Sequence, residues 1–111
     1  MDVLEQTQGA VRVIKPVGAL VSADIGAFKE TFVRTAKTAV TRVLIDMTGV
    51  PYVDSQGVET LVGMTEHLAV GGRSLKLCGV TPTVRKVIEL TGWLGEFEFY
   101  ADVPSGVRSF L

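Results

Sequence analysis

The apolar run RVLIDM at 42–47 constrains the fold more than any other segment of the chain. A strand with one face in water alternates apolar and polar residues, whereas this run is apolar almost throughout. Such a run is typical of a strand at the centre of a sheet that is covered on both faces. It therefore predicts a central strand, and the flanking segments must supply the layers that bury it.

The residues before this run predict a β-hairpin followed by a helix. Apolar residues alternate across 10–14, and Gly9 suits a tight turn. The second strand is expected to break at 16–18, where Pro16 and Gly18 occur. Ser22 is the expected N-cap of the helix that follows. Its apolar stripe consists of Ile25, Phe28, Phe32 and Ala36.

The residues after the run predict two more helices and two more strands. The first helix opens at Asp54 and ends at Gly71-Gly72, and the second opens at Thr81-Pro82. The segments SLKLCGV (74–80) and EFEFYA (96–101) predict strands, and 103–111 predicts a short terminal helix or turn. Alternating strands and helices favour an α/β fold. We expect a central mixed sheet of about four or five strands with helices mainly on one face.

Length, charge and cysteine content restrict the class of protein. A chain of 111 residues predicts one domain over 1–111. The net charge of −1 indicates no basic surface for nucleic acid. The first ten residues lack the pattern of a signal peptide, and no apolar stretch approaches the roughly 20 residues that cross a bilayer. The single cysteine, Cys78, excludes an internal disulfide and fits a reducing cytoplasm, where we expect this protein.

Catalytic and metal-binding patterns are weak. The one histidine, His67, lies about 18 Å along the predicted helix from Ser55, too far to act as its base. A lone histidine and a lone cysteine make a poor zinc site. No glycine-rich phosphate loop occurs. We therefore expect no catalytic residue, no metal and no cofactor.

The pair Asp54-Ser55 admits two interpretations. If Asp54 is the N-cap, Val53 and Val58 stand at the hydrophobic-staple positions. Ser55 then occupies the first helical position, where exposed N–H groups and the helix dipole favour a phosphate. Gly57 leaves the first turn without a side chain, which would let another protein approach. From the residues alone, the pair is either an ordinary helix cap or a serine held out for modification.

The segment VLIDMTGVPYVDSQGVETLVGM (43–64) resembles the signature of the STAS domain, as found in bacterial anti-sigma factor antagonists. In that family an Ile-Asp dyad ends a central strand, and an Asp-Ser-x-Gly motif opens the next helix. The flanking segments VGAL (17–20), GRSLKLCGVTPTVRKVIELTGW (72–93) and EFEFYADV (96–103) agree as well. The resemblance thus covers nearly the whole chain and implies a STAS-type fold.

The resemblance implies a binding switch that has no catalytic activity of its own. The serine of the motif, here Ser55, would be phosphorylated by a partner kinase that is also an anti-sigma factor. The unphosphorylated form would bind that partner and release a sigma factor, and a phosphatase of the metal-dependent Ser/Thr class would reset the switch. The alternative is an unmodified STAS scaffold subunit of a stress-sensing or membrane lipid-transport complex.

The partner-binding surface is expected at one edge of the sheet. The loops GALVSAD (18–24) and YVDSQG (52–57) both follow predicted strands. In a parallel arrangement, such loops meet at the same edge. The residues expected at this surface are Ser22, Asp24, Asp54, Ser55, Gln56 and Gly57.

Overall fold

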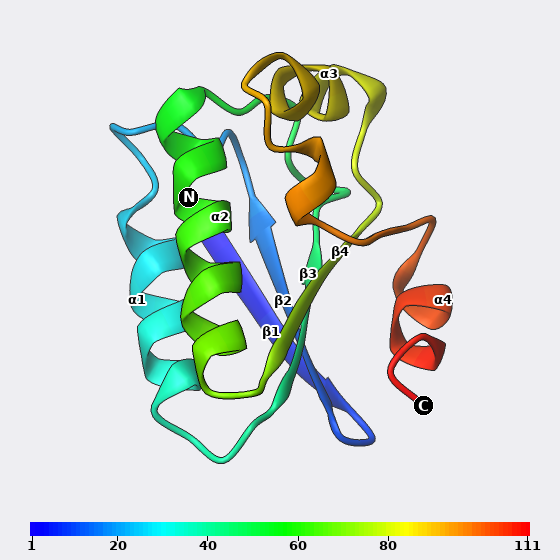
Figure 1. Cartoon of the computed structure of the whole chain (residues 1–111). Helices are drawn as coiled ribbons and strands as arrows, with labels where there is room; N and C mark the ends of the chain where they lie inside the picture. Colours follow the sequence, from blue (N-terminus) through cyan, green and yellow to red (C-terminus); the bar gives the residue numbers. More distant parts are fainter.

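Five strands form one mixed sheet in the computed structural model, which describes residues 1–111 (Figure 1). They lie in chain order: β1 (Asp2–Gln8), β2 (Val11–Val17), β3 (Arg42–Asp46), β4 (Ser74–Cys78) and β5 (Phe99–Tyr100). β1 runs antiparallel to β2, and every other neighbouring pair is parallel. The apolar run is confirmed as the central strand, and four of the five residues of β3 are buried.

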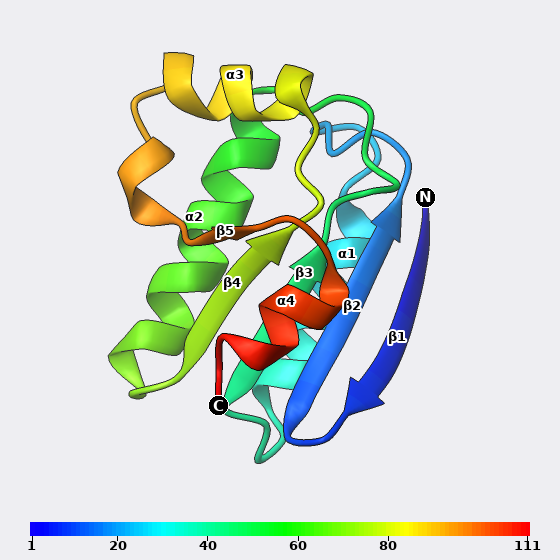
Figure 2. The same cartoon turned by 90° about the vertical axis from the view of Figure 1, so that its right-hand side faces the viewer.

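The helices lie mainly on one face of the sheet, as predicted. α1 (Gly26–Ala36) and α2 (Ser55–Val70) run side by side over that face, with α3 (Pro82–Leu90) above them (Figure 1). A turn of 3-10 helix, Leu94–Glu96, follows α3. The short helix α4 (Val103–Arg108) covers the opposite face (Figure 2). None of the helices is both long enough and apolar enough to cross a membrane.

Two apolar clusters of unequal size pack against the two faces of the sheet. Twenty buried residues form the larger cluster beneath α1, α2 and α3, including Val43 and Ile45 of β3. Leu44 points to the other face and joins a cluster of four with Val11, Val13 and Cys78, beneath α4. Because successive residues of a strand face opposite sides, the middle of β3, Val43 to Ile45, needs apolar side chains at every position. This is why the run 42–47 shows no alternation.

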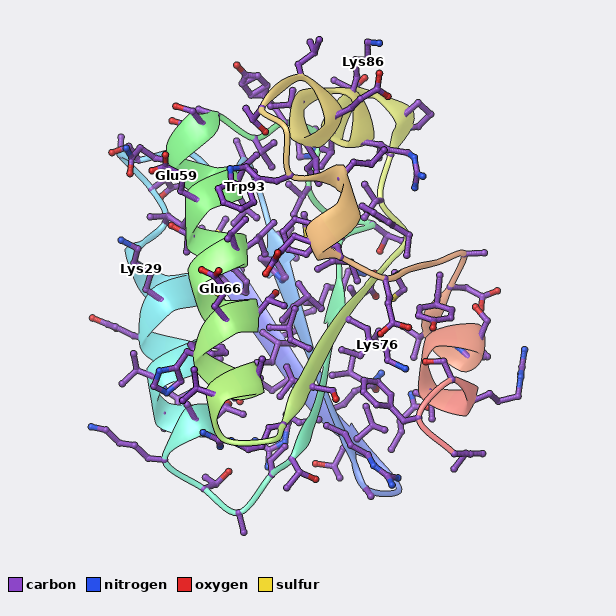
Figure 3. All side chains as sticks on the ribbon, viewed as in Figure 1. Lys29, Glu59, Glu66, Lys76, Lys86 and Trp93 are labelled. Atoms are coloured by element: carbon purple, nitrogen blue, oxygen red, sulfur yellow. The ribbon has the colours of Figure 1, made fainter.

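A buried lysine fastens α4 to the sheet. Lys76 lies in β4 with 9% of its surface exposed, on the side that faces α4 (Figure 3). Its ammonium group donates to the carbonyl oxygen (3.2 Å) and the hydroxyl (3.1 Å) of Ser109. It also lies 4.3 Å from the ring centre of Phe110, within cation–π range. The smaller cluster is therefore closed by polar contacts as well as by apolar ones.

Two expectations about the region before β3 were wrong. β2 does not break at Pro16 but continues to Val17. Its pairing with β3 ends at Ile14, so the missing N–H of Pro16 removes no hydrogen bond to that strand. Ser22 is not an N-cap either, because α1 begins at Gly26 after Ile25 and has no side-chain cap. Ser22 instead lies in a preceding turn.

The strand predicted over 96–101 is shorter than expected. Only Phe99 and Tyr100 pair with β4, and residue 96 belongs to the 3-10 helix. Phe97 is buried in the larger cluster, and its ring meets that of Phe99 edge to face at 6.1 Å. The apolar alternation in this segment thus reflects burial of the aromatic rings, with ladder pairing limited to two residues. The terminal segment contains the helix that was expected there, α4.

Candidate functional site

The loops after β2 and β3 are joined by backbone hydrogen bonds beyond the ends of the strands. The amide of Gly18 donates to the carbonyl of Gly49 (2.9 Å), and that of Leu20 donates to the carbonyl of Tyr52 (3.0 Å). The amide of Asp54 donates in turn to the carbonyl of Leu20 (3.2 Å). The two loops therefore meet at one edge of the sheet, as their positions after parallel strands predict.

The carboxylate of Asp54 binds both loops at once. One oxygen accepts from the amide of Gly57 (2.8 Å), which makes Asp54 the predicted N-cap of α2. The other accepts from the amide of Ser22 (3.0 Å). These hydrogen bonds, the one from Ser22 foremost, hold the pKa of Asp54 below its usual value, because they stabilise the charged form. Val53 and Val58, at the staple positions, are fully buried.

Ser55 is the first residue of α2 and is exposed to solvent. No hydrogen bond of the structure engages its hydroxyl, since the capping is done by Asp54. Gln56, the next residue, is exposed as well. A group attached to Ser55 would therefore displace no internal contact.

Gly57 has a different role from the one expected. It is buried, and a Cβ at this position would collide with the backbone carbonyl oxygen of Leu20. The glycine therefore lets the first turn of α2 pack directly on the loop after β2. The space beside Gly57 is filled by the chain itself and is not open to another protein.

Comparison with known proteins decides the family. Residues 3–106 match the family model of the STAS domain. The chain belongs to the STAS domain family. This confirms the resemblance seen in the sequence, and the five-stranded mixed sheet agrees with the fold that the resemblance implies.

Three solved structures illustrate the shared STAS fold. An anti-sigma factor antagonist from Mycobacterium paratuberculosis has a TM-score of 0.88 and 19% identity, over 97% of this chain and 92% of that one. An anti-sigma-factor antagonist (STAS) domain protein from Planctomyces limnophilus has a TM-score of 0.85 and 22% identity, over 98% and 97%. The anti-sigma factor antagonist SpoIIAA in its unphosphorylated form has a TM-score of 0.78 and 21% identity, over 98% and 96%.

Two signature segments of this STAS domain contact each other behind the site. Asp46, which ends β3, accepts hydrogen bonds from the amide (3.0 Å) and the hydroxyl (2.8 Å) of Thr48. Gly79, after β4, has a φ of +65° and packs against Thr48 so closely that a Cβ there would collide with its methyl group. A glycine is required here both by the backbone conformation and by the contact. Asp46, the second residue of the Ile-Asp dyad, therefore shapes the loop that leads to Ser55.

Sequence reasoning missed one exposed aromatic residue at this edge. Tyr52 lies three positions before Ser55, with 47% of its surface exposed. Exposed aromatic residues on loops contribute much of the binding energy at protein interfaces. The position of an aromatic residue in the short loop between Pro51 and the start of α2 could have indicated that it is exposed. The site also carries exposed acidic residues, Asp24 and Glu59, and the carboxylate of Asp24 lies 3.2 Å from the Met1 amine.

Neither His67 nor Cys78 joins Ser55 at this surface, because Cys78, at the end of β4, is buried in the smaller cluster on the opposite face of the sheet. His67 is near the other end of α2, where its ring meets that of Phe32 edge to face. Burial, and then the negative charges of Asp46 and Asp102, raise the pKa of the Cys78 thiol to about 12. No cluster of three or more histidine, cysteine or acidic side chains occurs that could hold a metal ion.

Proposed function

We propose that this STAS domain is an anti-sigma factor antagonist whose binding is switched by phosphorylation of Ser55. With a free hydroxyl it binds an anti-sigma factor that is also a serine kinase, and a sigma factor is released. The kinase transfers a phosphoryl group from ATP to Ser55, and a Ser/Thr phosphatase of the metal-dependent class removes it. The likeness to antagonists, one of them solved in an unphosphorylated form, supports this assignment.

The observation that carries the proposal is that Asp54 makes the structural hydrogen bonds at the start of α2, which leaves the neighbouring Ser55 without a structural role. Asp54 caps α2 and binds the neighbouring loop, whereas the hydroxyl of Ser55 is exposed and unbonded. A phosphate on Ser55 adds about −1.5 to −2 charges at the positive end of the helix dipole, where an anion is favoured. The modification therefore leaves the fold intact and changes only the surface.

Added charge at this position opposes binding. The interface would centre on the exposed members of the predicted set, Ser22, Asp24, Ser55 and Gln56. Asp54 and Gly57 support it from below by holding the two loops together. A dianion in a contact built around a neutral hydroxyl must lose its hydration, and this costs several kcal/mol without a new partner charge.

Intact mass spectrometry tests the proposal. After incubation with the partner kinase and ATP, the protein should gain the mass of a single phosphate, and Ser55→Ala should gain none. Hydrogen exchange in the complex should show protection at 18–24 and 52–57. If no kinase labels Ser55, and Ser55→Glu binds as tightly as the wild type, the unmodified scaffold subunit replaces the switch. Protection confined to 103–111 would place the interface on the wrong side of the molecule.

A further inference from the structure

A groove of about 600 Å³ runs between α1 and α2 on the outer surface of the helical layer. Its apolar lining comes from Phe32, Val33 and Ala36 of α1 and from Met64 of α2. Val33, although apolar and part of this lining, keeps 48% of its surface exposed. The groove extends from Gln56 to His67, which is about 16 Å along α2, or three helical turns.

A glycine that the fold does not need lies in this groove. Gly63 is in the interior of α2 and is exposed, and a Cβ there would meet no atom within 4 Å. Glycine inside a helix is less stable than alanine, because it loses more backbone freedom on folding. The packing of this chain thus offers no reason for a glycine at 63. Close approach of another backbone does offer one.

The two sides of the groove differ in charge. Lys29 of α1 and Lys37, the C-cap of that helix, lie eight residues or about 12 Å apart, and α2 contributes Glu59. None of the three side chains takes part in an ion pair of the structure. Lys29 and Glu59 lie at the end of the groove that holds the start of α2 (Figure 3). A helix with acidic residues about two turns apart would meet both lysines.

We propose that this groove receives an amphipathic α-helix of the partner protein. The apolar face of that helix packs on Val33 and Ala36 and approaches closest at Gly63, and its acidic edge faces Lys29 and Lys37. The groove begins at Gln56, adjacent to Ser55, so one partner can cover both places. The inference rests on the proposed function only for the identity of the partner.

Titration calorimetry with the purified anti-sigma factor kinase tests the groove apart from the serine. Gly63→Leu, which fills the groove from an exposed position, should weaken binding about tenfold or more while the protein stays folded. The pair Lys29→Glu and Lys37→Glu should weaken it by a similar factor. Lys86→Glu, a charge reversal on α3 away from the groove, is the control (Figure 3). It removes an exposed ion pair with Glu89 (3.1 Å) but should leave partner binding unchanged.

The possible results separate this inference from the proposed function. If Ser55→Glu abolishes binding and Gly63→Leu leaves it unchanged, the switch stands and the groove is not a docking site. If the kinase neither binds nor labels the protein, a designed helical peptide of about 18 residues, with leucines on one face and glutamates two turns apart, serves as the probe. Its addition should shift the amide resonances of α1 and α2 in the wild type but not in Gly63→Leu.

Two results with the protein alone or with the peptide would overturn the groove proposal. One is the absence of any shift with the glutamate peptide. The other is a dimer at rising concentration that Gly63→Leu abolishes, because the groove would then be filled by a second copy of the chain.

Discussion

The substitution Gly57→Ala tests the contact that seats α2 on the loop after β2. The added methyl group would collide with the carbonyl oxygen of Leu20, which is backbone and cannot rotate away. The helix and the loop must therefore move apart. That movement strains the hydrogen bond from the amide of Leu20 to the carbonyl of Tyr52, now 3.0 Å long.

The expected cost follows from three contributions. Forcing an extra carbon into a packed site costs about 1–3 kcal/mol. Weakening one hydrogen bond between the loops adds about 1 kcal/mol. The better helix propensity of alanine returns about 0.5–1 kcal/mol. The free energy of unfolding should therefore fall by about 2 kcal/mol, which lowers the Tm of a domain of this size by about 8 °C.

Urea unfolding followed by circular dichroism measures the effect, with Gly63→Ala as the matched control. Both substitutions add one methyl group to a glycine of α2, but the position at 63 is open. Gly63→Ala should therefore stabilise the protein by about 0.5–1 kcal/mol. Equal changes in the two variants, or a stabilised Gly57→Ala, would show that the contact with Leu20 does not limit this helix.

Four other expectations concern single side chains. Ser55→Ala should change the free energy of unfolding by less than about 1 kcal/mol in urea unfolding. Ser55→Glu should keep or raise that free energy while weakening partner binding, which calorimetry would measure. Hydrogen bonds keep the pKa of Asp54 below 3.8, so its carboxylate stabilises the fold above that pH. This stabilisation is lost as the pH falls through the lowered pKa of the folded state. The stability gap between wild type and Asp54→Asn should therefore be full at pH 6 and close in acid. Lys76→Ala should cost about 2–3 kcal/mol in urea unfolding, since it removes the bonds to Ser109 and leaves a void. Cys78 should resist alkylation at pH 8 until urea is added, because burial raises its pKa to about 12, and mass spectrometry would reveal early labelling.

The parts of the fold that were predictable are those with a strong local signal. The run 42–47 predicted the central strand because a side chain on either face must be buried there. The glycines at 71–72 and the Thr81-Pro82 pair predicted helix ends because their backbone preferences are local. Asp54 was predictable as a cap for the same reason.

The parts that failed depend on contacts between distant segments. Ser22 looked like a cap, but its amide binds the carboxylate of a residue thirty-two positions away. Gly57 looked like an opening, but the carbonyl of Leu20 fills it. The burial of Lys76 beneath α4 has no sequence signal, since a lysine in a strand normally faces water. Nor can periodicity show that α1 and α2 leave a groove between them.

The hydrogen bonds of Gly18, Leu20 and Asp54 hold the start of α2 against the loop after β2. Because the hydroxyl of Ser55 makes no internal hydrogen bond there, the proposed phosphate on Ser55 should not change the structure elsewhere in the domain. A protein that distinguishes the phosphorylated from the unphosphorylated form would therefore have to contact Ser55 directly. If Ser55 is phosphorylated as proposed, a protein that binds only the α4 face, on the opposite side of the sheet, should bind the phosphorylated and unphosphorylated forms equally well.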